Sequence, residues 1–285
     1  MSLKEIKTRI ASVAGTRKTT SAMKMVSSVK LRKAQQSIQY ALPYVEQLDR
    51  ILAGLSSMPQ VCKASPLVTE RETHNVAVVC FSSDTSLCGG FNGNIIRHSK
   101  ALIERLSASG SKPLVYTVGQ KITDSFGKQG MDIDNSFHDM MAKRLYSQAS
   151  VLADSLMDMF VKGQIDKVIL SYTHFVSPGC QRITDEVLLP VCVPEGSESL
   201  SHDYILEPSA EELVSSLLPK VIRMKLFSAM LDSYASEQAA RVIAMQAATE
   251  NADRLIEELT LQYNKLRQQA ITNELLDLEG GIQNQ

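Results

Sequence analysis

Residues 220–279 read KVIRMKLFSAMLDSYASEQAARVIAMQAATENADRLIEELTLQYNKLRQQAITNELLDLE and contain neither glycine nor proline. Glycine and proline are the residues that most often interrupt a helix, so this stretch predicts one long α-helix. Apolar or small residues recur along it at alternating steps of three and four, which is the heptad seam of a coiled coil. The seam positions are Val242, Met245, Thr249, Ala252, Ile256, Leu259, Tyr263, Leu266 and Ala270.

The length of this helix decides how the chain is organised. At about 1.5 Å per residue, one unbroken helix over residues 220–279 would be roughly 90 Å long. A compact globule of 285 residues would be only about 50 Å across. The helix therefore cannot fit inside its own protein, and a seam that leaves the globule needs a partner.

The N-terminal residues predict that partner. Ser2 and Glu5 have the spacing of a capping box, which starts a helix by satisfying free backbone N–H groups. The seam that follows is apolar at both ends and polar in the middle, and we expect the polar middle to meet something besides the second helix. Pro43 predicts a kink or an end of the helix nearby. The apolar positions are Leu3, Ile6, Ile10, Val13, Leu31, Ala34, Ile38, Ala41, Val45, Leu48 and Leu52, and the polar ones are Arg17, Thr20, Lys24 and Ser27.

Between the two seams the hydrophobic period changes. Short Val-rich runs, typical of buried strands, alternate with helical patterns, and this alternation predicts a small, mainly parallel α/β sheet. The expected strands are residues 75–81, 114–119, 166–175 and 183–193, and the expected helices are residues 94–106 and 139–160.

The predicted fold class is therefore α/β plus a long antiparallel coiled coil. The N- and C-terminal helices, residues 1–57 and 208–285, would form a shaft that flanks an inserted Rossmann-like module at residues 75–195. Residues 58–74 and 196–207 would be linkers. Ser, Thr, Gln and Ala occupy several inward positions of the shaft, so it buries less apolar surface than a Leu/Ile zipper. Such a rod would be better held by an outside socket than left in water.

Composition excludes several classes of protein. The net charge of −1 favours no particular partner. The five cysteines include no CxxC pair, which argues against a zinc site or a disulfide framework and favours a reducing compartment. No run of about 18 apolar residues is present, as a membrane-spanning helix would require. The opening MSLKEIKTRI lacks the apolar core of a signal peptide, and its lysines alone do not make a transit peptide.

The loop SSDTSLCGGFN, residues 82–92, is the strongest candidate for chemistry. It follows a strand and precedes a helix, where phosphates often bind, and a small nucleotide-dependent enzyme is one alternative. The loop matches neither phosphate-binding glycine pattern, so a tight turn is favoured. Cys88 is more typical of a small buried residue than of a nucleophile. Asp84 and the pair Asp185 and Glu186 are candidate paired carboxylates, although nothing in the sequence joins them. The histidine spacings predict no metal site, and no cofactor is expected.

The first 33 residues are basic, with Glu5 as their only acid. Such an arm could bind nucleic acid phosphates, so a nucleic-acid-binding coiled coil remains an alternative. No aromatic residue accompanies these charges for base stacking. A solvated or protein-facing surface is the favoured interpretation.

Three regions of the chain resemble the γ subunit of F-type ATP synthases, the central rotor shaft. Both long helices and the start of the module are covered, while residues 109–201 agree only in layout. The terminal motifs are too long to agree by chance. The regions are IKTRIASVAGTRKTTSAMKMVSSVKLRKAQ (residues 6–35), LCGGFN (87–92), and SEQAARVIAMQAATENA (236–252) with YNKLRQQAITNEL (263–275).

The resemblance implies a subunit that is not an enzyme by itself. It would transmit torque between a proton-driven ring of c subunits and the catalytic αβ hexamer, and so couple proton translocation to ATP synthesis or hydrolysis. Its partners would be the α, β and ε subunits and the c ring, with no cofactor. The coiled coil would enter the hexamer and the module would lie against ε and the c ring. The chain would be peripheral, on the cytoplasmic face of a bacterial inner membrane.

The resemblance also implies contact residues. Those matching family positions at the hexamer are Met23, Lys24, Cys88, Arg241, Gln268, Thr272 and Glu274, and those in the foot near ε and the c ring are Tyr204 and Glu207. The chain departs from the family's usual residues at Thr19, Ser21, Thr85 and Ser86.

Overall fold

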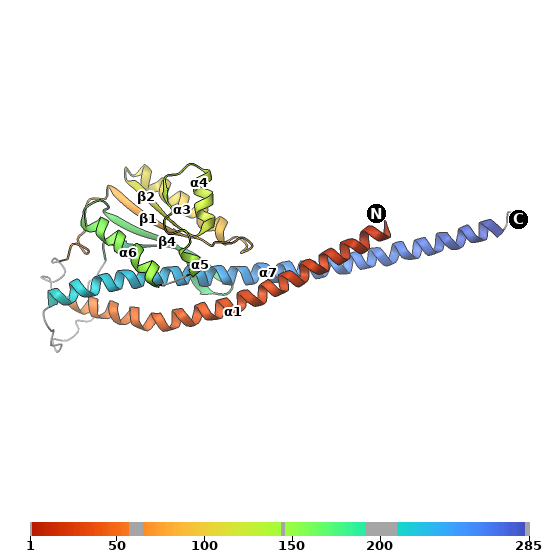
Figure 1. Ribbon diagram of the computed structural model, residues 1–285, viewed down its shortest axis with the longest axis horizontal. Coiled ribbons are helices and arrows are strands. Elements are labelled where there is room, and N and C mark those ends of the chain that lie inside the picture. Colours follow the sequence, from red (N-terminus) through yellow and green to blue (C-terminus); the bar gives the residue numbers. More distant parts are fainter. Residues whose placement is uncertain (1, 57–64, 144–145, 192–209, 283–285) are drawn as a thin grey trace. The chain divides into compact units, whose positions relative to one another are not determined.

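The computed structural model describes residues 2–56, 65–143, 146–191 and 210–282 (Figure 1). A long helix opens the described chain, an α/β module follows, and a second long helix ends it. The residues gather into two compact units, one formed by residues 1–28 and 241–285 and the other by residues 29–240. Both long helices contribute residues to both units.

The first helix, α1, spans Leu3–Ser56. It starts with the expected capping box, in which Ser2 N donates to Glu5 Oε2 at 2.8 Å and Glu5 N donates to Ser2 Oγ at 3.3 Å. Pro43 lies inside the helix and does not end it.

The last helix, α7, spans Ala210–Ile282 and contains Pro219. It therefore begins before the proline-free stretch that predicted it. Leu218 and Val221, on either side of the proline, are buried at 0% and 1% exposure. Burial of these apolar side chains offsets the backbone hydrogen bond that proline removes.

The second unit contains a five-stranded sheet in the order β3-β2-β1-β4-β5. Strands β1 to β4 pair in parallel, and β5 pairs antiparallel with β4. This confirms the predicted fold class of a mainly parallel sheet between two terminal helices. The two-residue β3 was not predicted, because it is too short to show a period. The strands are β1 (Asn75–Phe81), β2 (Lys112–Val118), β3 (Ile133–Asp134), β4 (Lys167–Ser177) and β5 (Cys180–Leu189).

Four shorter helices complete the described part of the module. Only Ile122 and Phe126 of α4 are buried, and two apolar residues give too weak a pattern to have been predicted. The helix expected over residues 139–160 is described as α5 and α6, and residues 144–145 between them lie outside the described chain. The helices are α3 (Phe91–Ala108), α4 (Gln120–Lys128), α5 (Met140–Lys143) and α6 (Tyr146–Val161).

Both faces of the sheet are covered, as is usual for parallel sheets. Alternate residues of β1 separate into two cores, because successive side chains of a strand point to opposite faces. One core contains Ala77, Val79 and Phe81, which pack with α6, α7 and the second half of α1. The other contains Val78 and Cys80, which pack with α3 and α4. Figure 1 shows α6 and α7 on one side of the sheet and α3 and α4 on the other.

In the first unit, α1 and α7 run antiparallel. Arg17 Nε lies 2.5 Å from Asp253 Oδ1, and Thr20 Oγ1 lies 2.9 Å from Thr249 Oγ1. The polar middle of α1 thus contacts α7 itself. The Arg17 and Asp253 side chains are still 51% and 44% exposed, and the expectation that this face also meets another partner stays a prediction.

Candidate functional site

The end of α7 extends beyond the start of α1. Counting back along both helices from the Arg17–Asp253 pair places Leu3 level with about residue 267, since both helices rise equally per residue. Figure 1 shows α7 continuing past the N-terminus of α1. The last turns of α7 therefore have no α1 beside them, although three of their apolar residues are exposed: Ile271 at 48%, Leu275 at 60% and Leu276 at 58%.

Apolar exposure recurs elsewhere on this unit. Met25 is 63% and Val26 is 55% exposed on α1, and Leu261 is 71% exposed on α7. Single exposed apolar residues are ordinary, but repeated ones on a helix pair mark a surface that binds another protein. We call the exposed apolar residues of the first unit the shaft surface. Its members are Met25, Val26, Ile243, Leu255, Leu261, Ile271, Leu275 and Leu276.

A cavity of about 280 Å³ in the same unit is lined by Arg17, Lys18, Ser21 and Thr249. Two cationic side chains and two hydroxyl groups meet there. Guanidinium, ammonium and hydroxyl donors together suit a carboxylate or another anion. The Arg17 guanidinium already pairs with Asp253. Lys18 is therefore the cation of this cavity that an acidic side chain of another protein would neutralise.

The predicted contact residues are not equally accessible. Gln268 and Thr272 are exposed on the final turns of α7, and Met23 and Lys24 are half-buried on α1. Arg241 is only 6% exposed, so a direct contact with another chain would involve a small part of its side chain. Two other predicted residues, Tyr204 and Glu207, lie outside the described residues, as does the side chain of Glu274.

The loop between β1 and α3 is held rigidly from within. Asn92 is its centre, because Asn92 Oδ1 accepts from Ser83 N at 3.1 Å and Asn92 Nδ2 donates to Cys88 Sγ at 3.1 Å. Cys88 is 2% exposed, whereas Leu87 is 59% exposed and has a φ of 67°. A bulky residue in the left-handed region is a genuine outlier. Leu87 is thus the exposed apolar residue of this loop, next to the exposed Thr85 and Ser86, and no sequence pattern could have singled it out.

The same loop also caps α4, the helix that follows β2. A bound phosphate would need the free N–H groups at a helix N-terminus. The first N–H groups of α4 are occupied by the chain itself, because Gln120 N donates to Asp84 Oδ1, Lys121 N to Ser83 O and Ile122 N to Ser82 Oγ. The loop is therefore a structural corner at α4, where Asp84 accepts a hydrogen bond from a backbone N–H of the helix start. The phosphate-binding hypothesis concerned α3 and stays a prediction.

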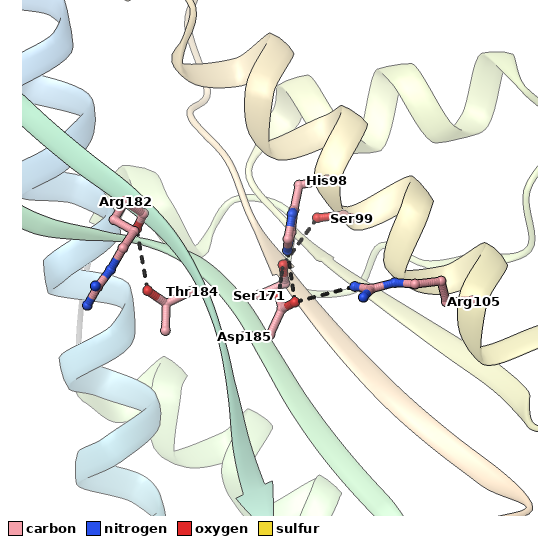
Figure 2. Close-up of polar contacts among 7 residues, drawn as sticks. All are labelled: His98, Ser99, Arg105, Ser171, Arg182, Thr184 and Asp185. Carbon is pink, nitrogen blue, oxygen red and sulfur yellow. Dashed lines mark hydrogen bonds and ion pairs between the residues drawn. The ribbon is translucent and has the colours of Figure 1, made fainter.

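Asp185, one of the candidate paired carboxylates, has partners of its own. Ser171 Oγ donates to Asp185 Oδ1 at 2.8 Å, and His98 Nε2 lies 2.8 Å from Asp185 Oδ2 (Figure 2). Arg105 Nη2 lies 4.0 Å from the same oxygen. This cluster holds α3 against β4 and β5, so its role is structural.

Two free cysteines of the module differ in environment. Burial raises the pKa of Cys80 to about 12, against the lowering effect of a hydrogen bond with Ser99 and with a smaller raising effect of Asp185. At pH 8 only about one Cys80 in ten thousand would then be a thiolate, the reactive form. Cys180 is exposed.

We expect an alkylating reagent at pH 8 to modify Cys180 and to leave Cys80 unmodified until denaturant is added. Peptide mass spectrometry measures both sites, and the denatured chain is the control. Equal labelling of the two thiols in the folded chain would contradict the buried position of Cys80. Because its pKa is raised in the folded chain, the buried Cys80 thiol favours folding. This contribution to the free energy of unfolding is fully present below the usual pKa of 9.0 and is lost as the pH rises towards about 12.

Known proteins resemble this chain over nearly its whole length. The family model described as ATP synthase matches residues 2–284. An ATP synthase gamma chain from Phocaeicola vulgatus is 49% identical, and one from Bacteroides thetaiotaomicron is 47% identical, each alignment covering 98% of both chains. None of the described helices is both long and apolar enough to cross a membrane.

Solved structures share the fold at low identity. A rotor chain of the Euglena gracilis mitochondrial ATP synthase has a TM-score of 0.62 and 16% identity, covering 94% of this chain and 98% of that one. A central stalk and c-ring structure of the Tetrahymena thermophila enzyme contains a chain with a TM-score of 0.56 and 20% identity, covering 80% and 98%. Nothing in these matches supports the nucleic-acid alternative. Together with the two helices and the inserted sheet, they show that the chain belongs to the ATP synthase gamma chain family.

Proposed function

We propose that this chain is the central-stalk rotor that transmits torque between a proton-driven c ring and a catalytic αβ hexamer. The observation that carries the proposal is the end of α7, which has exposed Ile271, Leu275 and Leu276 and no α1 beside it. Exposed apolar side chains on a lone helix are stabilised by a surrounding socket. The hexamer is the socket that the family supplies.

The mechanism follows from asymmetry. Three equivalent catalytic sites that surround one shaft meet different faces of it, so each site is biased towards a different conformation. Driving a two-state site from mostly open to mostly closed requires roughly 5 kcal/mol of differential contact energy. Rotation of the shaft moves this bias around the ring. Proton flow would turn the shaft during synthesis and ATP hydrolysis would reverse it, while the chain itself carries out no bond chemistry.

The contact residues are part of this proposal. Met23 and Lys24 on α1, together with Gln268, Thr272 and Glu274 on α7, would touch the hexamer. The cavity at Lys18 would accept an acidic side chain of a β subunit, since its cationic and hydroxyl groups complement a carboxylate.

Three further residues extend the proposed contacts. Leu87, held in place by the rigid loop that contains Cys88, would present an apolar contact to the collar of the hexamer. Tyr204 and Glu207 would contact ε and the c ring. The complex would hold the chain peripherally, on the cytoplasmic face of the inner membrane.

Purification of the tagged chain from its native host tests the function directly. We expect gentle solubilisation of the membranes to recover the α, β and ε subunits together with ATPase activity. An unrelated protein that carries the same tag is the control for non-specific adhesion to membranes. Recovery of the 31.4 kDa chain alone, or with nucleic acid, would contradict the rotor proposal.

A further inference from the structure

Strand β4 continues beyond the end of its pairing with β1. Its parallel pairing with β1 ends at Ser171, opposite Cys80, although β4 itself continues to Ser177. On its other edge β5 accompanies it as far as Ser177. The backbone groups of the extension that face away from β5 need other partners, because buried backbone N–H and C=O groups are almost always hydrogen-bonded.

Helix α7 supplies those partners through side chains. Phe175 N donates to Asp232 Oδ1 at 2.9 Å, and Ser236 Oγ donates to Thr173 O at 2.9 Å. The second carboxylate oxygen, Asp232 Oδ2, pairs with His174 Nδ1. Two side chains of a helix thus stand in for the missing strand. We call Thr173, His174, Phe175, Asp232 and Ser236 the β4–α7 clip.

The spacing of the clip matches both elements. Asp232 and Ser236 are four residues apart, so they lie one turn apart on the same face of α7. Thr173 and Phe175 are two residues apart, so their backbone groups point to the same side of β4. The Asp232 side chain is 14% exposed and Ser236 is 0% exposed, so water competes little for these bonds.

The clip sets the register of α7 in a way that apolar packing cannot. Leu226 and Met230 of α7 are fully buried against the module, but burial of apolar surface is non-directional. Hydrogen bonds require a defined distance and angle. A slip by one helical residue would turn α7 by about 100° and shift it by about 1.5 Å. Asp232 and Ser236 would then lose their partners on β4.

We propose that Asp232 and Ser236 are the positioning residues of the joint through which α7 and the α/β module turn together. This inference rests on the proposed rotor function. The joint is loaded when torque acts on the module and the far part of α7 resists. The clip holds one rotational setting of α7 under that load. Without it the helix can yield against the sheet, and ATP hydrolysis is then less tightly coupled to proton pumping.

A second polar contact between α7 and the module provides a matched control. Arg223 Nε lies 2.7 Å from Asp154 Oδ1 on α6. These side chains are 32% and 47% exposed, so solvent weakens the pair. Asp154→Ala removes the same charge as Asp232→Ala from a contact between the same two parts, but it leaves β4 untouched.

The test uses the assembled enzyme in sealed vesicles. In Asp232→Ala, we expect exchange of the Phe175 amide to be about tenfold faster, as the loss of one charge-assisted hydrogen bond implies. Proton pumping per ATP hydrolysed should fall, at unchanged subunit composition and hydrolysis rate. Asp232→Asn retains an acceptor for Phe175 N, so its amide exchange and its pumping per ATP should lie between those of the wild type and of Asp232→Ala. Asp154→Ala should match the wild type in both measurements.

Three results would overturn the joint: unchanged amide exchange in Asp232→Ala, faster exchange with unchanged pumping per ATP, or an equal loss of pumping in Asp154→Ala. If Asp232→Ala does not assemble, Ser236→Ala decides, because it removes only one hydroxyl and must still lower pumping per ATP. Failure of the wild-type chain to assemble with the hexamer would count against the rotor function itself. The wild-type sample therefore separates the two proposals.

Discussion

Replacement of Gly119 by alanine is expected to destabilise the α/β module by about 3 kcal/mol or more. Gly119 has a φ of +105°, and a Cβ placed on it would lie 2.2 Å from Ser82 O and 2.7 Å from Ser82 Oγ. Neither atom can move freely. Ser82 N donates to Val118 O, and Ser82 Oγ accepts from Ile122 N. Relief of the clash therefore breaks the corner that joins β1, β2 and α4.

Unfolding by denaturant, followed by amide exchange in peptides from β1 and β2, measures this loss. Gly127→Ala is the matched control, because Gly127 lies in α4 with no atom within 4 Å of an added Cβ. This control should stabilise the chain by about 0.5–1 kcal/mol, as alanine is the better helix former. Equal effects of the two substitutions would mean that the contact of Gly119 with Ser82 is not the reason for this glycine.

Replacement of Met23 by lysine is expected to lower the coupling between ATP hydrolysis and proton pumping while the complex still assembles. Met23 is half-buried on α1 and lies next to Lys24. The substitution adds a second positive charge to a surface that we propose to face the hexamer. A change of about 1.4 kcal/mol in the contact energy would alter the relative populations of a catalytic site tenfold.

The measurement is proton pumping per ATP hydrolysed, in vesicles that contain equal amounts of assembled enzyme. Met23→Leu is the control, because it keeps an apolar side chain of similar volume. It should pump as the wild type does. If Met23→Lys also pumped the same number of protons per ATP, Met23 would lie outside the coupling contact.

The loop between β1 and α3 is held by hydrogen bonds within the module. Residues 82–92 carry the family motif LCGGFN, yet most of their polar groups bond within the module. The motif thus builds a rigid support, and Leu87 is its exposed apolar residue. Gly89 has a φ of 59°, which favours glycine, and Asn92 bonds to Ser83 and Cys88 within the loop.

The hydrophobic patterns of the sequence were sufficient to predict the architecture. The proline-free run of residues 220–279 specified the long helix because its apolar residues repeat with the helical period. The Val-rich runs specified β1, β2 and β4 because buried parallel strands are apolar on both faces. Family motifs at both ends then identified the chain. All of these signals are local, and each repeats over enough residues to be recognised.

Only the tertiary structure decided the rest, because it depends on contacts between residues far apart in the chain. Burial beside the sheet keeps Pro219 within α7, and pairing with β2 forms the two-residue β3. Asp232 reaches His174 from 58 residues away, and Thr20 reaches Thr249 across 229 residues. A single hydrogen bond between distant residues leaves no period in the sequence. For this reason the sequence could predict which elements form but not which side chains hold them in register.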